Sequence, residues 1–309
     1  MESPEERFGT SGEASIDNLT SGVYASETIR RLSKRLETLQ VAVLADEERE
    51  PLHQFRVCLR RLRTVLQLFG PALLLPKGVS AARLAHVARR TSRSRDLDVL
   101  RIRLVNDIAP LLPAEEQKQL TSLLKDLQQD RRQAFLSLEE ALTGKRYRKL
   151  LCRLSRWLQE PRCSTLGALP LRPWACEWLA PITAGVFLEE GWFCQERQGE
   201  SLHRLRKRLK AMRYAIETLR PLLDPPLLAW LEKLKTAQDH LGDIHDLQVL
   251  QQALDGPQRP SRGMRPLPGL RASLDDQQQQ HWQKWLPLRE SLMGQRAQIS
   301  RDILLIGQP

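Results

Sequence analysis

Long apolar segments are missing from this sequence of 309 residues, and so are the marks of several protein classes. No apolar run approaches the ~20 residues that a membrane helix needs, so we expect no membrane partner. The five cysteines form no CxxC pair, which disfavours both a disulfide framework and a structural zinc site. The first thirty residues show no basic start followed by an apolar stretch, and we expect a cytoplasmic protein without a secretory signal.

Runs of β-branched residues are also scarce, and aromatic residues make up only 5% of the chain. Leu, Ala, Arg, Glu and Gln recur instead at helical spacing, which predicts an all-α protein. We expect helices over about 20–45, 51–69, 80–108, 113–158 (broken near 143–144), 174–198, 200–222, 225–254 and 274–305. The order is therefore four helices, a linker and four more helices.

The two halves of the sequence are similar to each other. An offset of 150 aligns residues 52–100 with 202–250 without a gap, and 13 of the 49 pairs are identical. Roughly four identities would follow from the composition alone, so we infer a tandem duplication of a helical unit. The predicted architecture is two four-helix bundles related by a pseudo-twofold axis. We expect a disordered acidic tail over 1–19, a first repeat over 20–160, a linker over 161–173 and a second repeat over 174–306.

The charge is positive and uneven. The chain has 48 Lys and Arg against 37 Asp and Glu, a formal net charge of +11. Residues 52–103 contain twelve basic and two acidic side chains, and residues 204–220 contain seven basic and one acidic. Such excesses favour a polyanionic partner. Arg supplies 37 of the basic residues, and its forked guanidinium suits phosphate better than an ammonium does.

One basic motif, His-x-x-Arg-x-x-x-(Arg/Lys)-x-x-Arg, occurs in both repeats. Its members are His53, Arg56, Arg60, Arg63, His203, Arg206, Lys210 and Arg213. In each copy the four side chains fall within an arc of about 80° on one helix, beside the apolar face and without an interspersed acid. Near a twofold axis the two stripes would converge into a basic central pore that holds a multivalent anion.

Further polar residues extend this hypothesis. Additional cations that we expect to contribute to binding are Arg61, Arg89, Arg93, Arg204 and Lys207. Asp96 and Asp246 occupy equivalent positions in the two repeats, and we expect each to receive an arginine of the stripe and hold it in place.

Four sequence blocks resemble the signatures of the CHAD family, the conserved-histidine α-helical domains. They are His53–Arg63, Ser94–Leu100, His203–Tyr214 and Leu241–Asp246. The resemblance covers roughly residues 20–305 and implies two four-helix bundles around a basic pore, binding of inorganic polyphosphate and, in some members, association with polyphosphate granules. Carried over by position, the eight motif residues would line that pore. Many relatives also carry a triphosphate-tunnel domain with an ExExK signature, which this sequence lacks, so its hydrolase activity is not implied.

Catalysis and metal binding are weaker hypotheses. The spacing of the acidic and histidine residues over 239–246 would allow a divalent ion, but only Asp246 has a counterpart in the first repeat, so we expect no metal or cofactor. His53 and His203 would serve an enzyme of polyphosphate metabolism as phosphoacceptors or as acid and base. Neither has a paired nucleophile or a Walker-type loop, so we expect no enzyme.

Nucleic acid is the rival partner, since phosphate contacts dominate its binding. No aromatic residue lies between the cations of either stripe, so few rings are present on which bases could stack.

Overall fold

The computed structural model describes residues 18–197, 199–255 and 267–306, and every named element in these ranges is a helix. The prediction of an all-α protein is confirmed. The predicted acidic tail lies, except for its last two residues, outside the described residues. None of the helices in the described ranges is long and apolar enough to cross a membrane.

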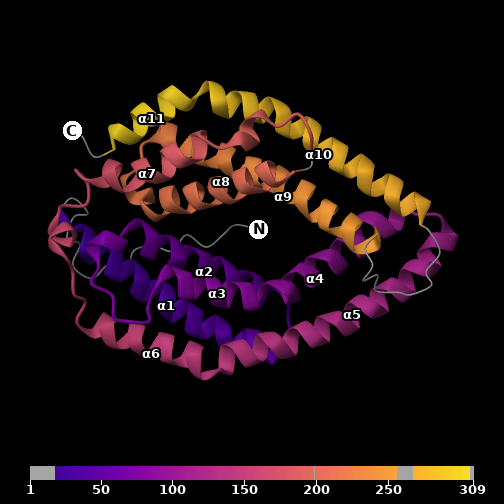
Figure 1. The fold of residues 1–309 in the computed structure, drawn as a ribbon, viewed down its shortest axis with the longest axis horizontal. Coiled ribbons are helices and arrows are strands. Elements are labelled where there is room, and N and C mark those ends of the chain that lie inside the picture. Colours follow the sequence, from indigo (N-terminus) through magenta and orange to yellow (C-terminus); the bar gives the residue numbers. More distant parts are fainter. Residues whose placement is uncertain (1–17, 198, 256–266, 307–309) are drawn as a thin grey trace.

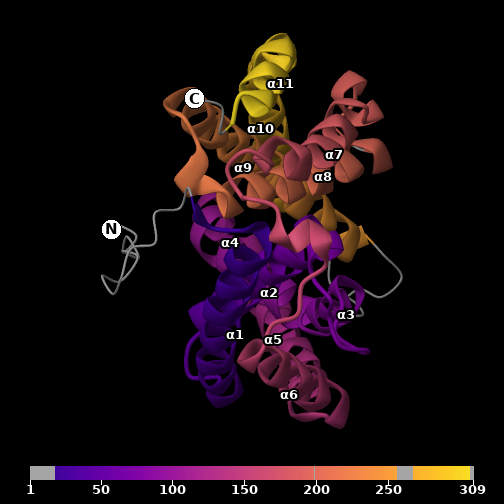
Figure 2. The same cartoon turned by 90° about the vertical axis from the view of Figure 1, so that its left-hand side faces the viewer.

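The N-terminal half forms the lower part of the molecule in Figures 1 and 2. Its α-helices are α1 (Ser21–Ala45), α2 (Glu50–Leu68), α3 (Ala81–Arg90), α4 (Ser92–Arg103), α5 (Ala114–Thr143) and α6 (Lys145–Gln159). Its shorter helical turns are η2 (Gly70–Ala72), η3 (Leu104–Ile108), η4 (Ala109–Leu111) and η5 (Thr165–Ala168).

The C-terminal half lies above it in both views (Figures 1 and 2). It contains α7 (Ala175–Phe187), η6 (Glu190–Phe193), α8 (Glu200–Thr218), η7 (Arg220–Leu222), α9 (Pro225–Asp255), α10 (Pro268–Gly294) and α11 (Arg296–Leu304). At the offset of 150, α2 and α8 begin and end at equivalent residues, and so do η2 and η7.

Local signals set several helix boundaries. The hydroxyl of Thr20 accepts a hydrogen bond from the Val23 amide and caps α1, and Ser80 caps α3 in the same way through the Arg83 amide. These side chains satisfy amides that the first helical turn leaves without a partner. Gly144 separates α5 from α6 at the predicted break.

The two halves share one core where α2 packs against α8. Helix α2 contributes Phe55, Leu59 and Leu62 to this core, and α8 contributes Leu205, Leu209 and Met212; each is at most 1% exposed. Burial of such a side chain is worth about 1.5–3 kcal/mol. Because this interface is continuous with the apolar interior of both halves, the halves are parts of one folded unit.

A second, smaller core joins the halves at the far end of the molecule, on the right in Figure 1. Leucines of η3, α5, α9 and α10 pack together there. Glu116 on α5 accepts hydrogen bonds of 2.9 Å from the amides of Gly269 and Leu270. A carboxylate from one half thus caps the first turn of α10 in the other half, where the helix dipole favours a negative charge.

Several helices differ from the sequence expectations. The helix expected over 80–108 is divided at Thr91 into α3 and α4, and the helix expected over 274–305 begins at Pro268 and is divided at Gln295. The helix expected over 174–198 ends at Phe187, and the chain then turns through η6 and returns against α8. The expected linker over 161–173 contains η5 and is tied to the start of α1, where the Ser21 amide donates to the Leu169 carbonyl at 2.8 Å. Gly191 permits the close approach of η6 to α8, because a Cβ at this position would lie only 2.5 Å from the Ser201 carbonyl oxygen.

Gly191→Ala is expected to lower the free energy of unfolding by about 2–4 kcal/mol, because neither α8 nor the η6 turn can move away without opening the core. Urea unfolding followed by circular dichroism measures the change. Gly294→Ala is the matched control, since open space surrounds that helical glycine. It is expected to be neutral or stabilising by about 0.5–1 kcal/mol. Equal losses in both variants would contradict the assigned close approach.

Candidate functional site

Eight basic residues from four helices gather where α2 packs against α8, and each interacts electrostatically with other members of the group. We call this set the central cationic cluster. Its members are His53, Arg56, Arg60, Arg95, His203, Arg206, Lys210 and His245. All eight side chains are half-buried. The structure thus brings together six of the eight motif residues and adds two others.

Arg56 is anchored at the joint between α3 and α4. Its guanidinium donates to the Ala88 carbonyl at 2.7 Å, to the Thr91 hydroxyl at 3.0 Å and to the Ser92 hydroxyl at 3.3 Å. Ser92 in turn donates to Asp96 at 2.9 Å. Asp96 therefore reaches Arg56 through a serine rather than directly. Burial lowers the pKa of Arg56 to about 10, which still leaves it charged at neutral pH.

Arg60 faces the other half of the molecule. Its Nε donates to the hydroxyl of Tyr214 on α8 at 3.2 Å. No carboxylate among the described residues forms an ion pair with Arg60. The ring of Tyr214 also supports Arg213, whose guanidinium carbon lies 4.5 Å from the ring centre. Tyr214 therefore links the two cationic stripes, a role that the sequence pattern did not indicate.

Arg213, the last residue of the α8 stripe, and Arg61 on α2 are paired with the same carboxylate, that of Glu217. Arg213 forms an ion pair of 2.9 Å with Glu217 and donates to Gln238 at 3.0 Å. Arg61 on α2 lies 3.7 Å from the other oxygen of Glu217. Glu217 thus screens this end of the interface.

Arg206 is held against α9. It lies 3.8 Å from Asp246, and burial lowers its pKa despite this neighbour. Its Nη2 would be 3.6 Å from a Cβ placed on Gly242, so the guanidinium rests over the backbone of α9. Burial raises the pKa of Asp246. The buried Nε of Arg206 has no hydrogen-bond partner among the described residues.

Lys210 has no ion pair with any described residue. Burial, together with the charges of Arg206 and Arg60, lowers the pKa of its amine to about 7. A lysine in such surroundings is poised to gain its proton when a negative charge arrives.

Two histidines of the second repeat, His203 and His245, form a stacked pair. The rings of His203 and His245 have centroids 4.4 Å apart and planes inclined by 30°. The buried Nδ1 of His203 has no hydrogen-bond partner among the described residues. Burial and the surrounding cations lower the pKa of both, that of His245 to about 4. Burial and Arg95 lower the pKa of His53 in the first repeat.

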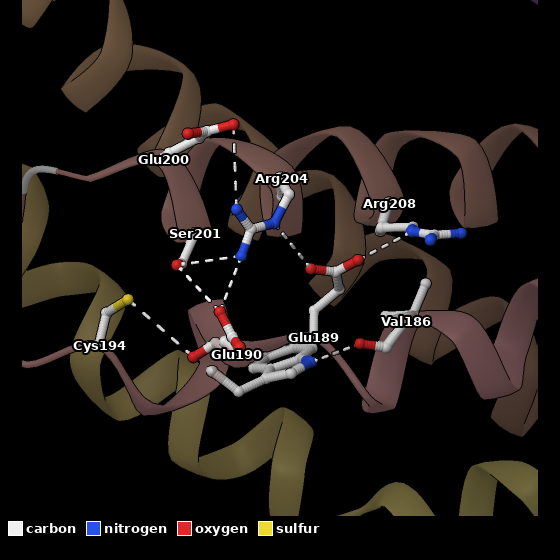
Figure 3. Close-up of polar contacts among 9 residues, drawn as sticks. Val186, Glu189, Glu190, Cys194, Glu200, Ser201, Arg204 and Arg208 are labelled. Atoms are coloured by element: carbon white, nitrogen blue, oxygen red, sulfur yellow. Dashed lines mark hydrogen bonds and ion pairs between the residues drawn. The ribbon is translucent and has the colours of Figure 1, made fainter.

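Arg204 is surrounded by three glutamates, Glu189, Glu190 and Glu200 (Figure 3). It lies 2.8 Å from Glu190, 3.7 Å from Glu189 and 3.9 Å from Glu200. Arg208 also pairs with Glu189, at 2.9 Å. These two arginines fasten α8 to η6.

The remaining predicted cations lie on the surface. Arg63, Arg89, Arg93 and Lys207 have exposed side chains. Arg93 lies 3.7 Å from Asp130, whereas the other three form no ion pair with a described residue. They are available to extend a binding surface beyond the cluster.

Arg95 and His245 belong to the cluster but were not selected from the sequence. They occupy equivalent positions at the offset of 150, and each precedes the repeated aspartate. Both are basic, but the residues differ, so a search for identities passed over them.

The acidic and histidine residues of α9 have another role. Asp243 accepts from Arg103 on α4 and lies 3.3 Å from Nδ1 of His281 on α10. His281 approaches His240, with 3.4 Å between their Nδ1 atoms. Within the described ranges, no group of three or more such ligands has a geometry that would hold a metal ion. Asp243 instead ties the two halves together.

The fold and the cluster define an all-α protein in which two cationic helices face each other across a shared core. The model of the CHAD domain family matches residues 27–255, and the chain belongs to this family. No curated protein matches the sequence.

Two solved structures show the same fold. The crystal structure of the CHAD domain from the plant Ricinus communis has a TM-score of 0.61 and 24% identity, over 94% of this chain and 92% of that one. PptA from Streptomyces chartreusis has a TM-score of 0.61 and 18% identity, over 90% of this chain and 99% of its own.

Lys210→Met is expected to stabilise the protein by about 1–3 kcal/mol at neutral pH, because it removes a cation from a half-buried, positively charged site. The lowered pKa means that the unfolded chain binds more protons than the folded one between about pH 7 and the ordinary lysine value. The parent therefore gains stability as the pH rises through this range, and the variant does not.

Denaturant titrations of parent and variant at pH 7 and at pH 9.5 measure this. The advantage of the variant should be greatest at pH 7 and should shrink at pH 9.5. An advantage that is the same at both values would refute the lowered pKa of Lys210.

Proposed function

We propose that the central cationic cluster binds inorganic polyphosphate through a basic pore between the two halves, and that the protein acts in the cytoplasm, on polyphosphate granules. The observation that carries the proposal is the meeting of two cationic stripes, in which Arg60 and Lys210 lack a carboxylate among the described residues. The CHAD domain family is associated with polyphosphate-related proteins, which supports this choice of anion.

The mechanism is polyvalent electrostatic capture. Half-buried like charges repel one another, and a phosphate between them replaces that repulsion with charge-assisted hydrogen bonds. Arg56 and Arg206 are already oriented by their contacts with α4 and α9, so little side-chain freedom remains to be lost on binding. Successive phosphates of one chain would engage successive cations, so affinity should rise with chain length and fall with added salt.

The proposal is for a binding protein rather than an enzyme. His203 stacks on His245, and burial together with Lys207 and Arg206 lowers its pKa, so its protonated form, which would act as an acid, is disfavoured in the free protein. Purified protein with polyphosphate and Mg²⁺ should therefore leave the chain length unchanged on a gel. Shortening of the chains would favour the alternative, an enzyme of polyphosphate metabolism.

The double substitution Arg60→Gln with Lys210→Gln is expected to weaken binding of long-chain polyphosphate by at least about a hundredfold, because each lost charge-assisted contact is worth about 1.5–3 kcal/mol. Calorimetric titration at fixed salt measures the affinity. The matched control is Arg204→Gln with Arg208→Gln, which removes two positive charges from the other face of the same helix (Figure 3). The control should stay within about threefold of the parent. Equal losses in both variants would show that net charge, not the cluster, determines binding.

Long-chain polyphosphate is expected to displace bound single-stranded RNA or duplex DNA, whereas neither nucleic acid should displace polyphosphate. Arg60 and Arg213 already lie over the ring of Tyr214, so this ring is not free to stack on a base, and the closely spaced guanidinium groups suit a bare phosphate chain better. Fluorescence anisotropy with labelled nucleic acid measures the competition. Displacement of polyphosphate by nucleic acid at similar phosphate concentration would favour the rival partner.

A further inference from the structure

The two halves of the central cationic cluster differ at two equivalent positions. Arg60 on α2 corresponds to Lys210 on α8, and Arg95 on α4 corresponds to His245 on α9. The other positions of the cluster are the same in both halves. In each case the first half has an arginine, which keeps its charge, and the second half has a group that can lose its proton.

The surroundings of His203, His245 and Lys210 disfavour the protonated, charged form of each group. His203 and His245 are stacked at 4.4 Å, and one buried nitrogen of His203 has no hydrogen-bond partner among the described residues. The groups that face these rings and Lys210 come from three helices. They are Arg60 from α2, Glu200, Arg206, Lys207 and Arg213 from α8, and Asp246 from α9.

Charging both rings and the amine together would place three more positive charges beside four existing cations and two carboxylates. Two unit charges about 4 Å apart repel each other by about 1 kcal/mol in water, and the repulsion is greater where water is partly excluded. A polyanion reverses this balance, because each added proton then gains a phosphate oxygen as a partner.

Resting on the proposed function, we propose that the α8–α9 half of the cluster, through Lys210 and His245, takes up more protons when polyphosphate binds than the α2–α4 half, which has arginines at the two equivalent positions. The equivalent positions and the stacked imidazole pair carry this inference. Binding is therefore linked to pH, and above about pH 7 the linkage arises from Lys210 in the second repeat.

The direction of the effect follows from the free protein. The pKa of Lys210 is about 7 and that of His245 about 4 before binding, both below their ordinary values. A bound anion raises both toward or above those ordinary values. Affinity therefore falls as the pH rises, through Lys210 above about pH 7 and through His245 between about pH 4 and 6.5, by up to about tenfold per pH unit for each proton.

Reciprocal substitutions test the assignment to one repeat. Lys210→Arg with His245→Arg gives the second half the residues of the first, and Arg60→Lys with Arg95→His does the opposite. Calorimetric titration with long-chain polyphosphate, in buffers of different ionisation enthalpy at about pH 6.5 and 8.5, gives both the affinity and the number of protons taken up. Long chains keep the contribution of titratable terminal phosphates small.

The parent should take up about one proton or more at pH 8.5 and lose at least about tenfold in affinity between the two pH values. Lys210→Arg with His245→Arg should bind almost equally at both, and Arg60→Lys with Arg95→His should show a steeper loss than the parent. Circular dichroism of each variant confirms that the helices are retained.

A parent that binds polyphosphate without proton uptake, or a second-repeat variant that keeps the parent's pH dependence, overturns this inference and leaves the proposed function standing. A parent that binds no polyphosphate at either pH overturns both.

Discussion

The packing of α2 against α8 is the constraint on which the rest of the structure depends. Each helix has an apolar face and, directly beside it, a stripe of cations. The apolar faces that carry Leu59 and Leu209 belong to one core, and because α2 also contacts α8, cations of the two stripes lie close together. The hydrophobic effect, which is non-directional and large, therefore assembles an electrostatic arrangement that is unfavourable by itself.

The surrounding structure compensates for this repulsion unevenly. Arg56 is tied to the joint of α3 and α4, Arg206 to Asp246, and Arg213 to Glu217. The far end of the molecule adds a second attachment between the halves through Glu116 and the small leucine-rich core. Arg60 and Lys210, at the centre, have no such carboxylate among the described residues. The molecule thus keeps its least compensated charges together at the contact between the halves, as functional sites commonly do at some cost in stability.

The duplication gives the site its internal comparison. The equivalent helices α2 and α8 have the same histidine and the same first arginine of the motif. The two halves of the cluster therefore differ only where Lys210 replaces Arg60 and His245 replaces Arg95. Arg204 and Arg208 show the opposite case. They lie on the same helix as Arg206 but on its other face, where the carboxylates of η6 pair with them. Position on the helix circumference, and not the abundance of arginine, separates the cations of the cluster from those that pair with carboxylates near η6.

Much of this was available from the sequence alone. Helical periodicity depends on local spacing, so the helices, the repeat at an offset of 150 and the face shared by His53, Arg56 and Arg60 were predictable. The tertiary structure alone decided which cations lie together and which are neutralised. Arg204 meets Glu189 and Glu190, Arg60 meets Tyr214, and His245 stacks on His203 because the chain turns at Gly191 and because α2 packs on α8. Those contacts join residues far apart in the sequence, and local spacing carries no information about them.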